Sequence, residues 1–271
     1  MKWKYVVGAG AALLVAPMFL LADLTPPEVE DGITAERAKR GRALLEALAV
    51  RHGRDVLAEH QRLELTLVDT WGGVMGSMFN PFAESTQTMD VVLATRAWTA
   101  SFRLTDGPDA GTEWGMKDLE IYRRPPGGAI ESPPAEDLDP MMSAKFLVPT
   151  LRYVMVLPVE IGNAELIAAL DPVTEEGRAF DRVFVTWGAV EAHAEDDQYI
   201  LWIDRASGRL DRVEYTVREM MRSAQGLARY EEYHETNGAL VPARVTLQAV
   251  LPGGPLARLH ELDMNSPRIV R

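Results

Sequence analysis

The chain has 271 residues, 47% of them hydrophobic and 25% charged, which is the mixture of an ordinary globular protein with one core. Its formal net charge of -12 argues against nucleic acid as a partner, because phosphate binding needs a clustered basic surface. The absence of cysteine excludes a disulfide framework, a Cys-ligated metal site and a lipid-modified N-terminal cysteine.

Residues 1–22 have the layout of an export signal. Lys2 and Lys4 precede an apolar run without charge. Ala22 suits the position before a cleavage site. Leu20, two residues earlier, is larger than the small residue that is preferred at its position, so the run could instead stay as an inner-membrane anchor. We therefore expect a signal peptide or membrane anchor here, and a periplasmic location for the rest of the chain.

Residues 23–33 contain two prolines and several acidic residues, and we expect an extended tether between membrane and domain. Residues 34–271 form a single domain in this interpretation. It begins with a helix for which Thr34 is the N-cap and which ends at His52-Gly53, since glycine commonly follows a helix C-terminus. A second, short helix is predicted from Asp55 to His60.

Strands follow the two helices. Leucine at every second position over 63–67 predicts a half-buried strand that ends near Trp71. Residues 89–104 form a longer extended run, bent near 99–101, and residues 114–122 form another.

The segment 72–82 is rich in turn-forming residues but also carries four large apolar side chains. Flexible apolar residues on a loop can gate a cavity or touch a membrane, and they can equally pack as a loop over the sheet. The candidate gating or membrane-contact residues are Met75, Met78, Phe79 and Phe82.

The second half of the chain begins with a helix over 140–157, which has an apolar stripe and is ended by Pro158. A short helix over 163–170 and a strand over 180–187 are predicted next. Residues 259–264 read as a final edge strand.

Residues 198–251 predict an antiparallel meander, in which extended segments alternate with turn residues such as Asn237-Gly238. Its last strand has an apolar and a polar face, so one side of the sheet is buried and the other is wet. The four predicted strands are Tyr199–Asp204, Leu210–Glu219, Leu227–His234 and Val241–Leu251.

These elements predict a mainly β fold of the α+β class, a curved antiparallel half-barrel with a few helices covering its concave face. Such a sheet can leave an apolar groove for a ligand, or the helix over 140–157 can fill it as a dry core, and alternation does not decide between the two. If a groove exists, we expect its lining to include Leu65, Leu67, Trp98, Leu151, Met155, Tyr215, Val245 and Leu247.

The motifs Tyr-Ile-Leu-Trp-Ile-Asp, Ser-Gly, Val-Glu-Tyr, Tyr-Glu-Glu-Tyr, Asn-Gly and Val-Pro-Ala-Arg occur in this order between Tyr199 and Arg244. This layout resembles the lipoprotein-carrier half-barrel superfamily (LolA, LolB and LppX-like), and most of all its uncharacterised bacterial members of the outer-membrane lipoprotein-sorting type. The resemblance implies a curved sheet with a helical lid and an acyl-chain or other lipid ligand. It carries over no catalytic residue, and the chain departs from LolB in lacking a lipidated cysteine.

We therefore expect an exported, non-catalytic carrier that uses no cofactor and no metal. Its partners would be a lipid or an acylated protein, together with a membrane surface or envelope proteins, and not nucleic acid. An alternative is a membrane-tethered periplasmic scaffold with a filled core that works through protein contacts. A hydrolase is a third hypothesis, and it requires a polar cleft around His193 or His234.

Overall fold

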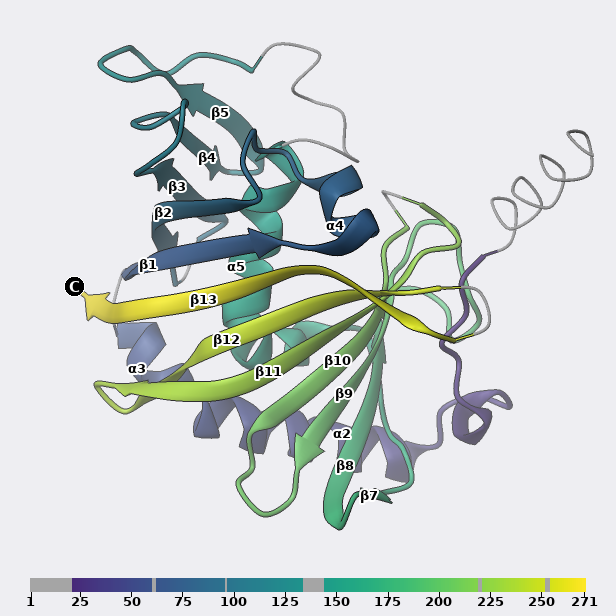
Figure 1. Ribbon diagram of the computed structural model, residues 1–271. Coiled ribbons are helices and arrows are strands. Elements are labelled where there is room, and N and C mark those ends of the chain that lie inside the picture. The colour runs from purple at the N-terminus through teal and green to yellow at the C-terminus, as the bar shows by residue number, and fades with distance from the viewer. Residues whose placement is uncertain (1–20, 60–61, 96, 134–143, 219–220, 252–253) are drawn as a thin grey trace, which may run out of the picture.

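The computed structural model describes residues 21–59, 62–95, 97–133, 144–218, 221–251 and 254–271. They form one antiparallel sheet of 13 strands, in the order β5-β4-β3-β2-β1-β13-β12-β11-β10-β9-β8-β6, with β7 paired to β8. The sheet curves strongly and does not close into a barrel (Figure 1). The predicted mainly β half-barrel is confirmed.

The strands alternate with short turns over most of the chain. Their bounds are β1 Arg62–Trp71, β2 Thr86–Ala94, β3 Thr99–Leu104, β4 Glu113–Lys117, β5 Glu120–Arg124, β6 Leu166–Ala169, β7 Val173–Glu175, β8 Arg178–Thr186, β9 Gln198–Asp204, β10 Leu210–Thr216, β11 Gln225–Thr236, β12 Ala239–Val250 and β13 Leu256–Val270.

Two extended runs of the first half are hairpins, and the prediction of single strands there was wrong. Residues 89–104 form β2 and β3, which pair antiparallel from Met89 with Leu104. Residues 114–122 form β4 and β5, joined at Asp118 and Leu119, whose φ angles are 52° and 70°. A tight turn built from non-glycine residues with positive φ leaves no turn signal in the sequence, since such residues rarely adopt that conformation.

The predicted meander is confirmed as β9 to β12, but the predicted edge strand at 259–264 was wrong. These residues belong to the long strand β13, which lies between β1 and β12 near the middle of the sheet. After β12, the last strand of the meander, the chain turns back as β13, and the other edge of β13 pairs with β1. Local pattern cannot reveal such a long-range pairing, because it depends on which distant strand is left without a neighbour.

The helices lie at the ends and on the concave side of the sheet. The first predicted helix is confirmed: the Thr34 hydroxyl accepts a hydrogen bond from the Arg37 amide at 3.3 Å, and Gly53 follows the C-terminus with a φ of 84°. None of the helices in the described part of the chain has the length and apolar character needed to cross a membrane. Their bounds are η2 Pro27–Val29, α2 Ala35–Arg51, α3 Arg54–Glu59, α4 Gly73–Phe79, α5 Ala144–Glu160 and η4 Ile161–Asn163.

The helical predictions for residues 140–170 need two corrections. Helix α5 does not end at Pro158 but continues to Glu160, with the proline inside it. The predicted short helix over 163–170 is η4 followed by strand β6, because a short buried apolar run has no period that separates helix from strand. The predicted start of α5 at Asp139-Pro140 lies outside the described residues.

The sheet is covered on both faces. The main core lies on the concave face, where α5 and α2 pack against the inward residues of the strands. A smaller core lies on the convex face of β6, β8 and β9, and Val29 is fully buried in it. Thus residues 23–33, the segment expected to be a tether, lie against the sheet, and Arg182 pairs with Glu28 at 2.9 Å.

A hydrogen bond from the sheet repairs the backbone of α5. In a helix the carbonyl of Val154 would accept the amide hydrogen of residue 158, but proline has none. The buried hydroxyl of Tyr230, on β11, donates to the Val154 carbonyl at 3.0 Å instead. This bond satisfies the orphan carbonyl and attaches α5 to the centre of the sheet.

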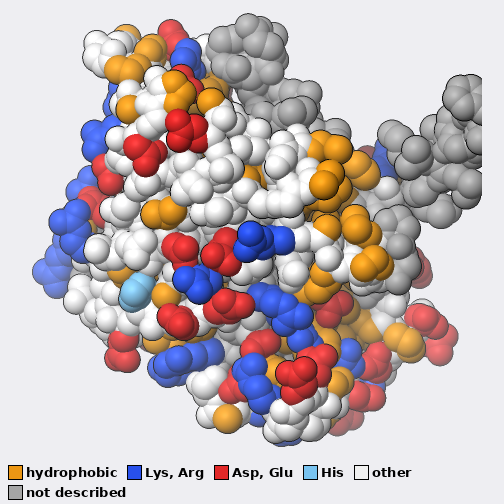
Figure 2. Space-filling model, viewed as in Figure 1, with side chains coloured by type: hydrophobic (Ala, Val, Ile, Leu, Met, Phe, Trp, Pro, Cys, Tyr) orange, Lys and Arg blue, Asp and Glu red, His pale blue; other side chains and the backbone are white. Residues whose placement is uncertain are grey.

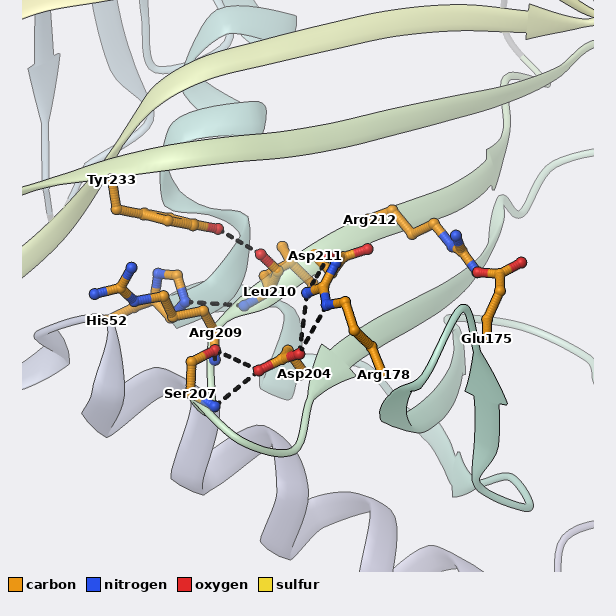
Figure 3. Close-up of polar contacts among 10 residues, drawn as sticks. All are labelled: His52, Glu175, Arg178, Asp204, Ser207, Arg209, Leu210, Asp211, Arg212 and Tyr233. Atoms are coloured by element: carbon orange, nitrogen blue, oxygen red, sulfur yellow. Dashed lines mark hydrogen bonds and ion pairs between the residues drawn. The ribbon is translucent and has the colours of Figure 1, made fainter.

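The turn between β9 and β10 is tied to the end of α2 by polar contacts (Figure 3). The Leu210 amide donates to Nε2 of His52 at 3.3 Å, and the Tyr233 hydroxyl donates to the Leu210 carbonyl at 2.7 Å. Burial, together with the charges of Arg51 and Arg209, lowers the pKa of His52 from 6.5 to about 4. His52 therefore stays neutral in the folded chain at neutral pH, as an acceptor on Nε2 requires.

The Tyr230–Val154 bond predicts a specific coupling. We expect Tyr230→Phe to lower the free energy of unfolding by about 1–3 kcal/mol, because it leaves a buried carbonyl without a donor. In the background of Pro158→Ala the same substitution should cost clearly less, since Ala supplies the missing amide hydrogen. Urea denaturation of the four proteins of this cycle measures the coupling, and equal costs in both backgrounds would contradict the assignment.

His52 predicts a pH dependence of stability. The unfolded chain binds a proton at His52 below about pH 6.5 and the folded chain only below about pH 4, so stability is lost as pH falls through this window. The loss is at most about 3 kcal/mol. We expect His52→Gln to flatten the stability profile between pH 6.5 and 4 in chemical denaturation. His193→Gln, at a half-exposed side chain, is the matched control and should leave the profile unchanged.

Candidate functional site

The concave face is only partly filled. A cavity of about 820 Å³ lies between the inward side of β9 to β13, helix α5 and helix α4. It occupies the end of the half-barrel that carries α4 and the turn between β10 and β11 (Figure 1). Its walls are overwhelmingly apolar, with a few polar side chains, which is the usual composition of a small-molecule site.

Helix α5 borders the cavity with one face and fills the core with another. The spacing of Phe146, Thr150, Tyr153 and Leu157 places these side chains on a single helix face, and all four line the cavity. Leu151 and Met155 are buried in the core, where the helix packs against β3 and β4. The helix therefore plugs one part of the concave face and forms a wall of the cavity in the other.

Small residues on the sheet make room for the cavity. Gly226, Ala228 and Ala249 lie on the cavity wall formed by β11 and β12. A Cβ atom at Gly226 would lie 2.4 Å from Cζ of Tyr215, so the ring of Tyr215 lies flat over the glycine. Any larger residue at position 226 would push this ring into the cavity.

Four tyrosines form part of the cavity wall, of which Tyr230 is buried and the others are partly buried. Tyr153, Tyr199, Tyr215 and Tyr230 line it, and burial raises the pKa of each above its ordinary value. The hydroxyls are thus neutral hydrogen-bonding groups throughout the physiological range. The hydroxyl of Tyr153 is buried without a geometrically acceptable hydrogen-bond partner among the described residues.

Trp98 lines the outer part of the cavity, and Arg152 packs against its ring. Its side chain is 48% exposed, and the guanidinium of Arg152 lies 4.5 Å from its ring centroid. Arg152 is itself buried and forms a two-pronged ion pair with Glu160, at 2.6 and 2.8 Å. It also donates to the carbonyl of Ala97, so one α5 side chain fixes the turn that presents Trp98.

Helix α4 closes one side of the cavity. The segment expected to be a loop is a short helix, and Met75 and Phe79 line the cavity from it. Met78 is 54% exposed, and Phe82 packs edge-on against Phe102 of the core. Gly76 lets the helix lie directly on β13, because a Cβ atom there would be 2.2 Å from a backbone oxygen.

The structure divides the eight side chains expected to line a groove. Trp98, Tyr215 and Leu247 line the cavity. The others, which are not among its lining residues, are buried in the adjoining core; they are Leu65, Leu67, Leu151, Met155 and Val245.

Several residues that line the cavity were not predicted from the sequence. For those on β1, the spacing of inward residues could have predicted them. The inward row of leucines on β1 continues at the same spacing to Asp69 and Trp71. Trp71 lines the cavity together with His260, which is opposite it on β13. Tyr153, Tyr199 and Tyr230 carry no comparable signal, because their place in the cavity wall depends on how α5 packs against the sheet.

Polar clusters elsewhere are modest. His193 lies 3.5 Å from Asp196 in the loop between β8 and β9, and His234 contacts the carbonyl of Met264. Within the described ranges no three His, Asp or Glu side chains are arranged to hold a metal ion.

The sequence matches no family model and no curated protein. Solved structures do match. A DUF1329 family protein from Desulfovibrio piger superposes with a TM-score of 0.57 at 9% identity, over 86% of this chain and 93% of that chain. A LolA superfamily protein from Nitrosomonas europaea superposes with a TM-score of 0.53 at 12% identity, over 85% of this chain and 93% of that chain.

At such low identity this likeness concerns the fold alone. It agrees with the motifs between Tyr199 and Arg244, which serve strands and turns. The chain has the open half-barrel fold of LolA-type proteins.

Proposed function

We propose that the protein is a non-catalytic carrier that holds a lipid, an acyl chain of a lipoprotein or a similar hydrophobic ligand in the cavity of its concave face. The observation that carries the proposal is the apolar cavity of about 820 Å³ between α4, α5 and the sheet. Its volume lies within the range of roughly 300–1,000 Å³ that is usual for ligand pockets. The LolA-type fold of its structural neighbour supports the same class of function.

The physical basis for binding is the removal of apolar surface from water. Each methylene group of a chain placed among these aromatic and aliphatic side chains contributes about 0.8 kcal/mol. The scattered hydroxyls of the wall restrict where a polar group of the ligand can lie. The proposal assigns no residue a catalytic role and requires no cofactor.

We propose further that the cavity faces a membrane in an exported protein. The described chain starts beside the cavity: the Ala22 amide donates to the Arg222 carbonyl at 2.8 Å, in the turn between β10 and β11. The apolar residues that precede it in sequence would therefore meet a bilayer at this end. Figure 2 shows hydrophobic side chains gathered at this end of the molecule, over α4 and the neighbouring strand ends. On α4, Val74 and Met78 are 81% and 54% exposed.

Filling the cavity should abolish binding. We expect Ala249→Trp, on the cavity wall of β12, to weaken binding of a fluorescent fatty acid by about tenfold or more, because the indole occupies the space of the chain. Thr246→Trp adds the same side chain to the opposite face of the strand and should leave affinity unchanged. Mass spectrometry of lipids extracted from detergent-free protein gives a second readout, and absence of lipid and of fatty-acid binding would refute the proposal.

Exposed apolar residues of α4 should matter for transfer rather than for affinity. We expect the double variant Val74→Asp/Met78→Asp to bind lipid in solution like the parent but to exchange it with vesicles several-fold more slowly, because a charge disfavours contact with a bilayer. Leu119→Asp is the control, at a side chain that is 67% exposed but does not line the cavity. Equal exchange rates for all three proteins would mean that α4 does not face the membrane.

A further inference from the structure

Asp69 breaks the pattern of the strand on which it lies. The inward row of β1 is made of leucines at 63, 65 and 67, and the next inward position is Asp69, which has no exposed surface. A carboxylate in such a place costs several kcal/mol unless it is fully paired. Asp69 lies between Leu67, which is part of the packed core, and Trp71, which lines the cavity.

The partners of Asp69 are two side chains of the cavity wall. Oδ1 lies 2.8 Å from Nδ1 of His260, and Oδ2 accepts a hydrogen bond from Nε1 of Trp71 at 2.9 Å. Trp71 and His260 are opposite each other on β1 and β13, and their rings stack with centroids 4.0 Å apart and an interplanar angle of 18°. Asp69 thus fixes both rings in place from behind.

This arrangement determines what His260 can offer to a ligand. Since an ionised carboxylate only accepts hydrogen bonds, Nδ1 carries a hydrogen and donates it to Asp69. Nε2 is then the remaining polar atom of the ring. His260 is only 5% exposed to solvent, and it lines the cavity.

We infer that His260, positioned by Asp69 and Trp71, binds the acidic headgroup of a single-chain lipid such as a fatty acid. The inference rests on the proposed carrier function and names the ligand class of the same cavity. Nε2 takes up a proton from solvent when the anionic ligand binds, and the imidazolium then donates from both nitrogens, to Asp69 and to the ligand carboxylate. The alkyl chain extends along the apolar wall toward Tyr215 and α5.

Other charged groups lie near the cavity besides the buried Asp69: Asp197 is among the lining residues, and Arg152 lies against Trp98. Arg258 precedes His260 on β13, is half exposed and lies against Gly72, where it adds positive potential at the cavity entrance. Its partner Glu261, 3.9 Å away, lies three residues further along the same strand, next to His260. Across the strand pair, β12 places the apolar Leu247 opposite His260. Among the described residues that line the cavity there is no Lys or Arg, and His260 is the one whose side chain can carry a positive charge.

The test compares oleate with oleyl alcohol, which have the same chain and differ in the headgroup. We expect the ratio of their affinities to favour oleate in the parent protein and to fall by about tenfold or more in His260→Gln, because a charge-assisted hydrogen bond is lost while the amide can still bond Asp69. Leu247→Val is the control: both affinities should change by the same factor. Asp69→Asn should lower the ratio in the same direction as His260→Gln.

A readout that needs no variant is the imidazole nitrogen spectrum of protein labelled at its five histidines. Oleate should shift the signals of one ring, His260, and oleyl alcohol should not. If both ligands bind with the same ratio in the parent and in His260→Gln, and no ring responds to oleate, His260 is a structural residue and the inference is refuted while the carrier function stands. If neither ligand binds the parent protein, the carrier function fails as well.

Discussion

The packing of α5 against the sheet depends on Pro158, which has no amide hydrogen to donate within the helix. The helix carbonyl of Val154 is left free by the proline, and Tyr230 from the centre of the sheet donates to it at 3.0 Å. This contact attaches α5 to the middle of the sheet. One face of the helix completes a packed core, and another face borders a cavity that the sheet does not fill.

The cavity follows from a graded choice of side chains along the strands. On β1 the inward leucines of the core lead to Trp71 at the cavity, and on β12 Val245 and Leu247 lead to Ala249. Small residues leave space, and the rings of Trp71 and Tyr215 line it with stiff surfaces that do not collapse inward. A carrier needs this combination, because a soft wall would close when the ligand leaves.

Much of the fold could be predicted from the sequence because it is encoded locally. The leucine row of β1, the N-cap Thr34 and the turns of the meander all act within a few residues, and the motifs after Tyr199 identified the half-barrel. The central place of β13 and the two hairpins with non-glycine turns depend on distant pairing or rare backbone angles. The spacing of β1 already places Asp69 in the inward row, but its partner His260 is 191 residues away and could not be identified from the sequence.

The packing of the first described residues has a consequence for the proposed export signal. Ala22 is only 7% exposed, its amide is hydrogen-bonded to Arg222, and Leu24 is held through its amide by Gln198. A peptidase requires an accessible, extended chain, so the folded body would shield the bond after Ala22. If residues 1–22 are the proposed export signal, its cleavage at this bond would have to precede docking of the segment, and rapid folding would favour retention of the proposed anchor.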